Sequence, residues 1–321
     1  MARSPNRTPH PSHSLPLICA APLLLLLPLP AFVQSDPSPA TDAAALIRRS
    51  VANHMTAEAA HHPQRFVLHK KDDRRDYIQE IIETRQGDVA LAIAANGAPL
   101  NPDLRQSQID RLSNLDAHPD LQEHRHKREL EDNARVDKLM RLLPDAFLYH
   151  DDGIVPCTVN VPPEVLVPGS PPASQPTPPP TGTATPSAEC YHLTFKPNPA
   201  WSPPDIESKI MRGMAGEVWI EKSQERLTRL NAQLIADVDF GWGFIGHLDK
   251  GGTIYLEQTE TTPNDWELTR MKLNLTGRAL LVKALNIRMT EEMAHYSPVP
   301  TDLDYHKAIQ MLQKAQPPPA K

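Results

Sequence analysis

The strongest constraint on the fold is a two-residue alternation of apolar and polar side chains in the C-terminal half of the chain. It begins near Met214 and recurs in successive runs, which are separated by turn-sized segments at residues 222–225, 250–252 and 263–265. Alternation of this period places the apolar side chains on one face of each strand. The C-terminal half therefore predicts an antiparallel meander with one apolar face. We expect that face to include Val218, Ile220, Leu230, Leu234, Ile254, Leu256, Leu273 and Leu275.

The N-terminal half supplies elements that can cover this face. Residues 41–60 carry apolar side chains at helical spacing and predict an amphipathic helix. Residues 65–71, 76–85 and 88–95 predict three antiparallel strands, and residues 102–143 predict an almost continuous helix with mixed charges. A sheet with one apolar face must cover that face. The sequence therefore predicts an α+β fold, in which a strongly curved antiparallel sheet, an incomplete β-barrel, wraps around the helices.

A proline-rich segment at residues 156–189 interrupts this pattern. Eleven of its 34 residues are proline, and its only charged residues are Glu164 and Glu189. A segment of this composition does not pack a core. Because it separates two strand-like stretches, residues 146–150 and 190–196, we expect a disordered loop inserted in a hairpin. A linker between two domains is the alternative.

The sequence contains three cysteines, Cys19, Cys157 and Cys190. The last two flank the proline-rich segment, and they form an even pair if the N-terminal segment is removed. An oxidising compartment would favour a disulfide between them. Two unpaired thiols beside a loop are the alternative, because only geometry decides whether two cysteines can be joined.

The first 35 residues have the pattern of a secretory signal peptide. Arg3 and Arg7 precede a leucine-rich apolar run, and the first acidic residue is Asp36. Several prolines interrupt the apolar run, which makes a retained membrane anchor the less favoured alternative. We therefore expect cleavage near Ser35 and a periplasmic or secreted protein.

The sequence shows no catalytic signature. It contains no Gly-x-Ser-x-Gly, His-Glu-x-x-His, Walker or dinucleotide-binding motif. Its 39 acidic and 33 basic residues do not favour nucleic acid as a partner. His118, His124 and His126 form the strongest metal candidate, but histidines in a charge-rich helix are usually solvated. We expect no catalytic residue, no metal and no cofactor, and a hydrolase with an unfamiliar site is the least favoured alternative.

Two smaller features have a structural interpretation beside the functional one. Asp237 and Asp239 share a strand face and could hold a cation, but we favour two exposed carboxylates at the end of a strand. Trp219 and Trp242 could stack on a ligand, but we favour packing in a core or an interface.

The order of the expected elements and several short motifs resemble LolA-like proteins. The motifs are Ala215-Gly-Glu-Val-Trp-Ile-Glu-Lys222, Arg226-Leu-Thr-Arg-Leu230, Asp237-Val-Asp-Phe-Gly241 and Leu248-Asp-Lys-Gly251. LolA-like proteins include periplasmic lipoprotein carriers, the regulator RseB and lipid-binding lipoproteins of mycobacteria. The resemblance covers residues 43–296 and implies an incomplete β-barrel whose apolar cavity is closed by helices and accepts acyl chains or a lipidated partner. The proline-rich insertion and the highly charged second helix depart from this pattern.

The resemblance implies a single domain over residues 36–300, followed by a C-terminal tail at residues 301–321. It also implies that the eight apolar residues named above line a ligand cavity, and a core filled against the helices is the alternative. We therefore expect an exported, monomeric binding protein that is not an enzyme and that holds a lipid or a lipoprotein acyl chain. An envelope sensor or interaction domain that binds a membrane-protein partner is the alternative.

Overall fold

The computed structural model describes residues 42–157, 165, 167–168, 188–240, 246–279 and 283–314. The expected signal peptide and its cleavage site lie outside these residues. Trp242, most of the proline-rich segment and residues 315–321 also lie outside them.

The described residues form four α-helices, one 3₁₀ helix and thirteen strands. The helices are α1 (Ala43–Ala59), α2 (Pro102–Ala117), α3 (Pro119–Ala146), η1 (Glu207–Gly213) and α4 (Tyr305–Lys314). The first six strands are β1 (Gln64–Asp72), β2 (Asp76–Ile82), β3 (Val89–Ala95), β4 (Ala98–Pro99), β5 (Phe147–Pro156) and β6 (Glu189–Pro197). The others are β7 (Met214–Glu221), β8 (Arg226–Leu234), β9 (Val238–Phe240), β10 (Gly246–Leu248), β11 (Thr253–Thr262), β12 (Asp265–Ala279) and β13 (Lys283–Pro298).

All these strands belong to one antiparallel sheet. Its order is β4-β3-β2-β1-β13-β12-β11-β8-β7-β6-β5, and β10 pairs with both β9 and β12 beside this path. The strand β1 pairs with β13, for example Val67 with Ala294, which joins the N-terminal strands to the C-terminal meander. The expected α+β class and the antiparallel meander are therefore confirmed.

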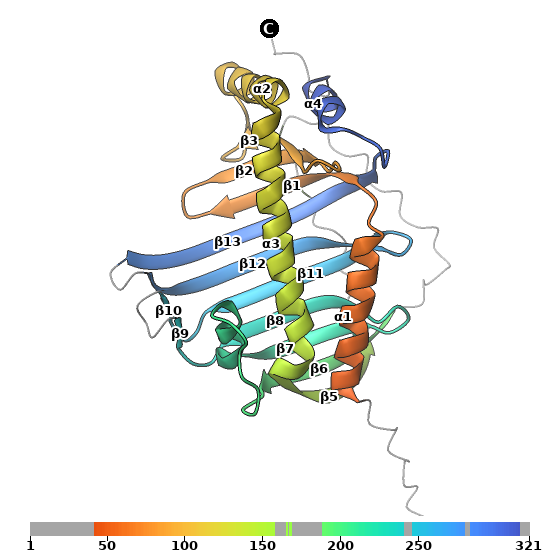
Figure 1. Ribbon diagram of the computed structural model, residues 1–321, viewed down its shortest axis with the longest axis vertical. Helices are drawn as coiled ribbons and strands as arrows, with labels where there is room; N and C mark the ends of the chain where they lie inside the picture. Colours follow the sequence, from red (N-terminus) through yellow and green to blue (C-terminus); the bar gives the residue numbers. More distant parts are fainter. Residues whose placement is uncertain are drawn as a thin grey trace, which may run out of the picture. The chain divides into compact units, whose positions relative to one another are not determined.

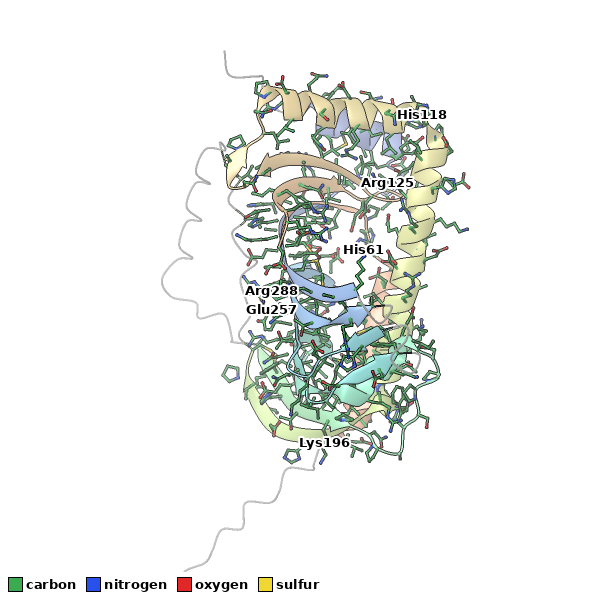
Figure 2. All side chains as sticks on the ribbon, turned by 90° about the vertical axis from the view of Figure 1, so that its left-hand side faces the viewer. His61, His118, Arg125, Lys196, Glu257 and Arg288 are labelled. Atoms are coloured by element: carbon green, nitrogen blue, oxygen red, sulfur yellow. A yellow bond between two sulfur atoms is a disulfide. The ribbon has the colours of Figure 1, made fainter. Side chains whose placement is uncertain are left out.

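The sheet is open, and its curvature is smaller than expected. The path ends at β4 on one side and β5 on the other, and these two strands do not pair in the described part of the chain. Figures 1 and 2 show α1 and α3 crossing one face of a long sheet that is neither closed nor strongly curled around them. The expectation of a strongly curved, incomplete barrel was thus wrong in degree, because alternation defines the face that is buried but not how far the sheet coils.

The charged segment at residues 102–143 forms two helices where one almost continuous helix was expected. The helix α2 ends at Ala117, His118 adopts φ −128° and ψ 81°, and α3 begins at Pro119. A proline disfavours the helical conformation of the residue before it, and its missing N–H costs nothing at the first position of a helix. Pro119 therefore ends one helix and starts the next.

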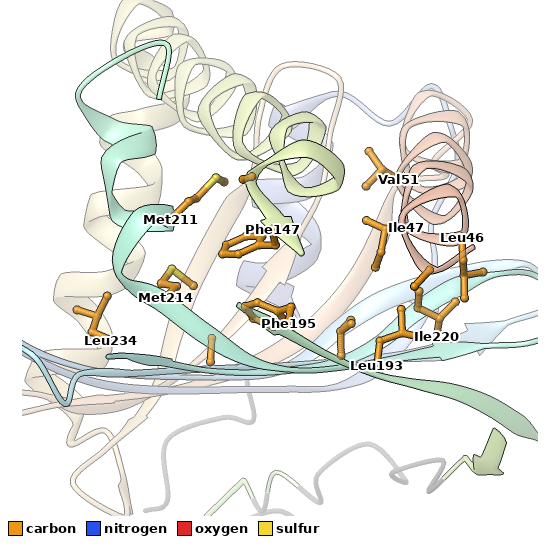
Figure 3. Packing of buried hydrophobic residues seen from close by; sticks show 14 of the residues in the cluster. Leu46, Ile47, Val51, Phe147, Leu193, Phe195, Met211, Met214, Ile220 and Leu234 are labelled. Carbon is orange, nitrogen blue, oxygen red and sulfur yellow. The ribbon is translucent and has the colours of Figure 1, made fainter. Parts of the chain in front are cut away.

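A large apolar core joins α1 and the C-terminal part of α3 to strands β5 to β8. Figure 3 shows Ile47 and Val51 of α1 on the side of the helix that faces the sheet. Opposite them lie Leu193 and Ile220, and both are fully inaccessible to solvent. Burial of each such side chain stabilises the fold by roughly 1.5–3 kcal/mol.

A second apolar core lies at the other end of the sheet, where α2 and α4 pack with β3. Leu112 and Leu115 of α2 contact Ile309 and Leu312 of α4 in this cluster, and all four are buried. The helix α4 lies within the stretch that the sequence suggested to be a tail. The C-terminal stretch is therefore part of the folded structure at least as far as Lys314.

The described ends of the proline-rich segment are tied together. Strands β5 and β6 pair from Phe147 with Pro197 to Pro156 with Glu189, so the segment connects the two strands of a hairpin. Cys157, directly after β5, forms a disulfide with Cys190 of β6, with their Cα atoms 4.9 Å apart. This bond is consistent with an oxidising compartment. None of the described helices is both long and apolar enough to cross a membrane.

One described part of the proline-rich segment packs on the sheet. Val165 is buried against Ile78 of β2, Ala94 of β3 and Ala294 of β13, and its carbonyl oxygen lies 3.2 Å from Nε2 of His295. The expectation of a disordered loop falls mostly on residues outside the described set. At Val165, however, the chain adds an apolar contact to the sheet.

Candidate ligand-binding site

The apolar residues of the expected cavity share one face of the sheet. Cross-strand pairs place Val218 opposite Leu230 and Leu230 opposite Leu256, while Ile254 lies opposite Leu273. Residues that lie directly opposite each other in an antiparallel pair share a face. Because Val218 and Leu230 pack against α1 and α3, this is the face that the two helices cross.

The eight residues divide into two groups. Six of them pack in the large core between the sheet and the helices: Val218, Ile220, Leu230, Leu234, Ile254 and Leu275. The other two, Leu256 and Leu273, are half-buried and belong to no apolar cluster in the described structure. The sequence pattern is the same for all eight residues, but only the first group packs in an apolar core of the described structure.

Two residues of the first group, Val218 and Leu230, border a narrow crevice between α1, α3 and the sheet. Its volume is about 20 Å³, which is room for about one water molecule. An acyl chain does not fit in this space as it stands, so the side chains here form a filled core. The lining is almost entirely apolar and consists of Ile47, Ser50, Val51, Met140, Leu143, Phe147, Tyr149, Phe195, Val218, Leu227 and Leu230.

The middle of α3 is exposed on all its sides. Residues 130–136 are seven consecutive exposed residues, which is about two turns of helix. Leu130 is 54% exposed and Val136 is 56% exposed, although both are apolar. If the sheet packed directly under this part of α3, the side chains on the inner side of the helix would be buried. The middle of α3 therefore stands clear of the sheet.

The part of the sheet that lacks a helical cover is apolar. Leu256 pairs with Met271, and Leu273 pairs with Met289. All four side chains are half-buried and lie on the face that α1 and α3 cross. We call these four residues the apolar strip. It continues the face of Leu230, so it leads directly into the filled core.

Both ends of α3 are fixed. At the N-terminal end, Nε2 of Gln122 donates a hydrogen bond of 2.8 Å to the carbonyl oxygen of Gln86, and the backbone N–H of Asp88 donates one of 3.1 Å to Glu129. At the C-terminal end, the hydroxyl of Tyr149 donates a hydrogen bond of 2.8 Å to the carbonyl oxygen of Leu143. The helix therefore bridges the strip and is supported on either side of it.

A cluster of acids surrounds His61, just after the end of α1. Nε2 of His61 lies 2.8 Å from Oε2 of Glu83, while its Nδ1 lies 3.4 Å from Oε1 of Glu267 and 3.8 Å from Oδ1 of Asp265. Gln64 donates its backbone N–H to Glu83 at 2.7 Å and its amide Nε2 to Asp265 at 2.6 Å. Figure 2 shows His61 on the side of the sheet that faces α3.

The cluster carries more negative than positive charge. The hydrogen bond to Glu83 raises the pKa of His61 to about 9. Burial, opposed by the charge of His61, raises the pKa of Glu267 to about 7. Nearby, burial and the charge of Glu129 raise the pKa of Asp88 to about 8. Titratable groups thus gather at strand ends and in loops near the N-terminal part of α3, in contrast to the apolar strip.

The other side of the sheet holds a cavity of about 180 Å³ beside the disulfide. Trp219 lies in its wall, where it stacks on His192 at 4.6 Å between ring centroids and lies under the guanidinium of Arg229 at 5.2 Å. Trp266 also lines this cavity and donates a hydrogen bond of 2.8 Å from its indole to Gln224. Trp219 therefore has partners within the chain on its ring and also lines the cavity.

The remaining candidates from the sequence do not converge on a site. Asp239 lies 2.8 Å from Nδ1 of His247, and Asp237 accepts a hydrogen bond of 2.7 Å from the backbone N–H of Lys250. His118 and His124 are exposed on or beside the charged helices. Among the described residues, the one group of three potential metal ligands is at His61.

The chain matches no protein-family model, no curated protein and no solved structure. The resemblance to LolA-like proteins therefore stays a prediction, and the function has to be argued from the geometry of this chain.

The acid cluster has no signal in the sequence, whereas the exposed middle of α3 does. His61 and Glu267 are far apart in the sequence, and their segments come together because β1 pairs with β13 and β13 pairs with β12. In contrast, the dense mixed charge of residues 102–143 did predict a solvated helix. The same feature is a departure from the LolA-like pattern, and it corresponds to the exposed stretch of α3 at residues 130–136.

Proposed function

We propose that this protein is an exported, non-enzymatic binding protein that holds an acyl chain or a lipoprotein anchor on the apolar strip, beneath the middle of α3. The observation that carries the proposal is the run of exposed residues 130–136 in the middle of α3. This part of the helix crosses β12 and β13 (Figure 1), which carry three of the four half-buried residues of the apolar strip. A binding protein needs apolar surface that folding has left uncovered, and the strip is such a surface.

The energetics of the proposed site are those of apolar burial. Each square ångström of apolar surface removed from water contributes roughly 25 cal/mol. Met271 and Met289 suit this role because an unbranched thioether side chain adapts to ligands of different shape. Binding at this site involves no chemical reaction, since it requires only contact between apolar groups and the exclusion of water.

The geometry favours a ligand that lies along the sheet over one that is enclosed by a barrel. The crevice beside Leu230 has room for about one water molecule only. A chain that begins on the strip can extend into this crevice if α1 moves away from the sheet. We therefore propose the strip as the site of first contact and α1 as the element that moves.

The disulfide and the expected signal peptide support an extracytoplasmic location. Cys157 and Cys190 are both almost fully buried and joined. Disulfides of this kind persist in the periplasm or outside the cell and are rare in the cytoplasm. An acyl chain that crosses an aqueous compartment of this kind needs a protein to shield it from water.

The test is to express the protein with its own leader, extract the purified protein and identify bound acyl species by mass spectrometry. Purified protein without lipid is then titrated with a fluorescent fatty acid. We expect Leu273→Asp to weaken binding at least about tenfold, because a charge on the strip must be desolvated when the ligand binds. Leu148→Asp is the matched control, since Leu148 is an exposed leucine on the edge strand β5. Equal affinity of the two variants would contradict the proposal.

A second candidate function is an envelope interaction domain, and the edge strand β5 favours it. This strand ends the sheet, and Leu148 and Ile154 on it are exposed apolar residues. An unpaired edge can accept a strand from a partner protein. In this case Leu148→Asp would abolish capture of the partner while fatty-acid binding stayed unchanged, so the same two variants separate the two functions.

A further inference from the structure

We propose that His61, Asp265 and Glu267 form a binding site for a divalent transition-metal ion such as Zn²⁺, which fastens the end of α1 to the β11–β12 hairpin. The proposal is independent of the proposed acyl-chain function. It rests on the donor atoms, on their spacing, and on two buried oxygen atoms that have no hydrogen-bond partner among the described residues.

The donor set suits such an ion. The three residues offer one imidazole nitrogen and two carboxylate oxygens, and these atoms lie within 4.8 Å of one another. Zn²⁺ binds histidine nitrogen and carboxylate oxygen at about 2.0–2.2 Å. In a tetrahedral site with bonds of that length, two donor atoms are roughly 3.4 Å apart. The distances from Nδ1 of His61 to Glu267 and Asp265, 3.4 and 3.8 Å, are close to this value.

The second ring nitrogen of His61 is held as in known metal sites. Nε2 lies 2.8 Å from Oε2 of Glu83, which fixes the plane of the ring and directs Nδ1 toward the other two carboxylates. A histidine that binds a metal through one nitrogen usually donates the other N–H to a carboxylate or a carbonyl oxygen. Glu83 is therefore a positioning residue for the proposed ligand.

The charge of the cluster calls for a further cation. Glu83, Asp265 and Glu267 have His61 as their one ion-pair partner within the described structure. Three carboxylates that share a single imidazole repel one another, because even a protonated histidine neutralises only one of them. A divalent ion would balance the remaining charge.

Two buried oxygen atoms point to the same place. Oε1 of Glu267 is shielded from water and has no hydrogen-bond partner in the described structure. Gln64 is 1% exposed, its Nε2 contacts Asp265, and its Oε1 also lacks a partner. A buried oxygen without a partner costs roughly 1–3 kcal/mol. Coordination of an ion by Glu267, and a bridging water on Gln64, would remove this cost.

The proposed ion would connect parts of the structure that are distant in sequence. His61 follows α1, Asp265 and Glu267 begin β12, and Glu83 follows β2. An ion here would hold the C-terminal end of α1 against the sheet, at the opposite end of that helix from Asp42. It would therefore limit the movement of α1 without contacting the apolar strip.

The experiment is a titration of the chelator-treated, untagged protein with Zn²⁺, followed by calorimetry. We expect one equivalent to bind, and His61→Ala and Glu267→Gln each to weaken binding at least about a hundredfold. Glu83→Gln, which removes only the positioning carboxylate, is expected to weaken it about tenfold to a hundredfold. Circular dichroism of each variant shows whether the fold is intact.

His69→Ala is the matched control. His69 also lies 2.8 Å from a carboxylate, that of Asp76, but it belongs to no group of three ligands. Its replacement is expected to leave Zn²⁺ affinity within about twofold. With Co²⁺ as the probe, the wild-type protein is expected to show the visible absorption of a four-coordinate site, which His61→Ala lacks. Equal Zn²⁺ affinity of folded His61→Ala and wild type, or absence of a stoichiometric site, would overturn the proposal.

Discussion

Residues 130–136 and residues 139–143 belong to the same helix and lie over the same face of the sheet, yet only the second group is packed against it. Leu139, Met140, Leu142 and Leu143 contribute to the large core, whereas the earlier stretch is exposed on all sides. This difference in packing follows from the amino-acid composition of the two stretches. Four of the five residues at 139–143 are apolar, while residues 131–135 contain two acids, an arginine and an asparagine.

A continuous apolar face of a sheet therefore need not be covered by packed helices along its whole length. The sheet keeps its alternation from Val218 through Leu256 to Leu273, but its cover changes from a packed helix to an open one. In the packed region the side chains fill the space. In the open region the same kind of residue remains available to a ligand.

The largest effect on the free energy of unfolding is expected when a leucine is replaced by alanine in each of the two regions. Leu193 is fully buried in the packed region, so Leu193→Ala should lower the free energy of unfolding by about 3 kcal/mol. Leu273→Ala on the apolar strip should lower it by about 1 kcal/mol or less, because the removed atoms are already partly in water. Urea denaturation measures both values. Equal losses would show that the strip is as well covered as the core.

A smaller effect on stability is expected from the side chain of Asp88, whose backbone N–H bonds to Glu129 in the N-terminal half of α3. Burial first, and then the charge of Glu129, raise the pKa of its carboxyl group to about 8 from the ordinary 3.8. Glu83 acts in the same direction, while Arg125 and His61 oppose it. Because the folded pKa is raised, folding takes up a proton between these values, and this contribution to stability is lost as the pH rises from about 4 to about 8.

Asp88→Asn removes that loss, so the variant should unfold at a higher temperature than the wild type at pH 8. The difference should shrink as the pH approaches 4, where both proteins are neutral at this position. Thermal melts at three pH values provide the measurement. A variant that is less stable than the wild type at pH 8 would show that the ionised carboxylate is needed there.

The smallest effect on stability is expected from Val136, in the exposed stretch of α3. Val136→Lys should change the free energy of unfolding by less than about 0.5 kcal/mol, since no packing is lost at an exposed helical position. Leu143→Lys, seven residues later, places the same charge at the filled crevice and should cost several times more. A large loss for Val136→Lys would mean that the middle of α3 is covered.

The sequence pattern predicted the parts of the fold that depend on local periodicity. The alternation around Val218 and Leu230 identified the apolar face, and the cysteines at 157 and 190 marked the two ends of the insertion. The degree of sheet curvature was not predictable in this way, because coiling depends on how the helices pack on the sheet. The break at Pro119 was visible in the sequence, but the high helical propensity on both sides of it obscured the break.

The candidate site was predictable only in part, for a physical reason. Leu256 and Leu273 were identified by their alternation, but the alternation is identical for residues in a filled core and residues on an open strip. The acid cluster gave no local signal, since His61 lies near Glu267 only because β1 pairs with β13 and β13 with β12. The helix α4, in contrast, has a local signal that the prediction of a tail overlooked: its buried residues recur at helical spacing, namely Tyr305, Ala308, Ile309 and Leu312.

The central claim is that the apolar strip is open to solvent and receives an acyl chain. Since Cys157 and Cys190 are joined to each other, a cysteine introduced on the strip is a suitable reporter. The most direct measurement is the rate at which Leu273→Cys reacts with a maleimide, with and without a fatty acid, compared with Leu193→Cys in the core. If the strip is open and binds an acyl chain, we expect rapid reaction at position 273, strong protection by the fatty acid, and almost no reaction at position 193. Slow reaction at position 273, or a rate that the fatty acid leaves unchanged, would contradict it.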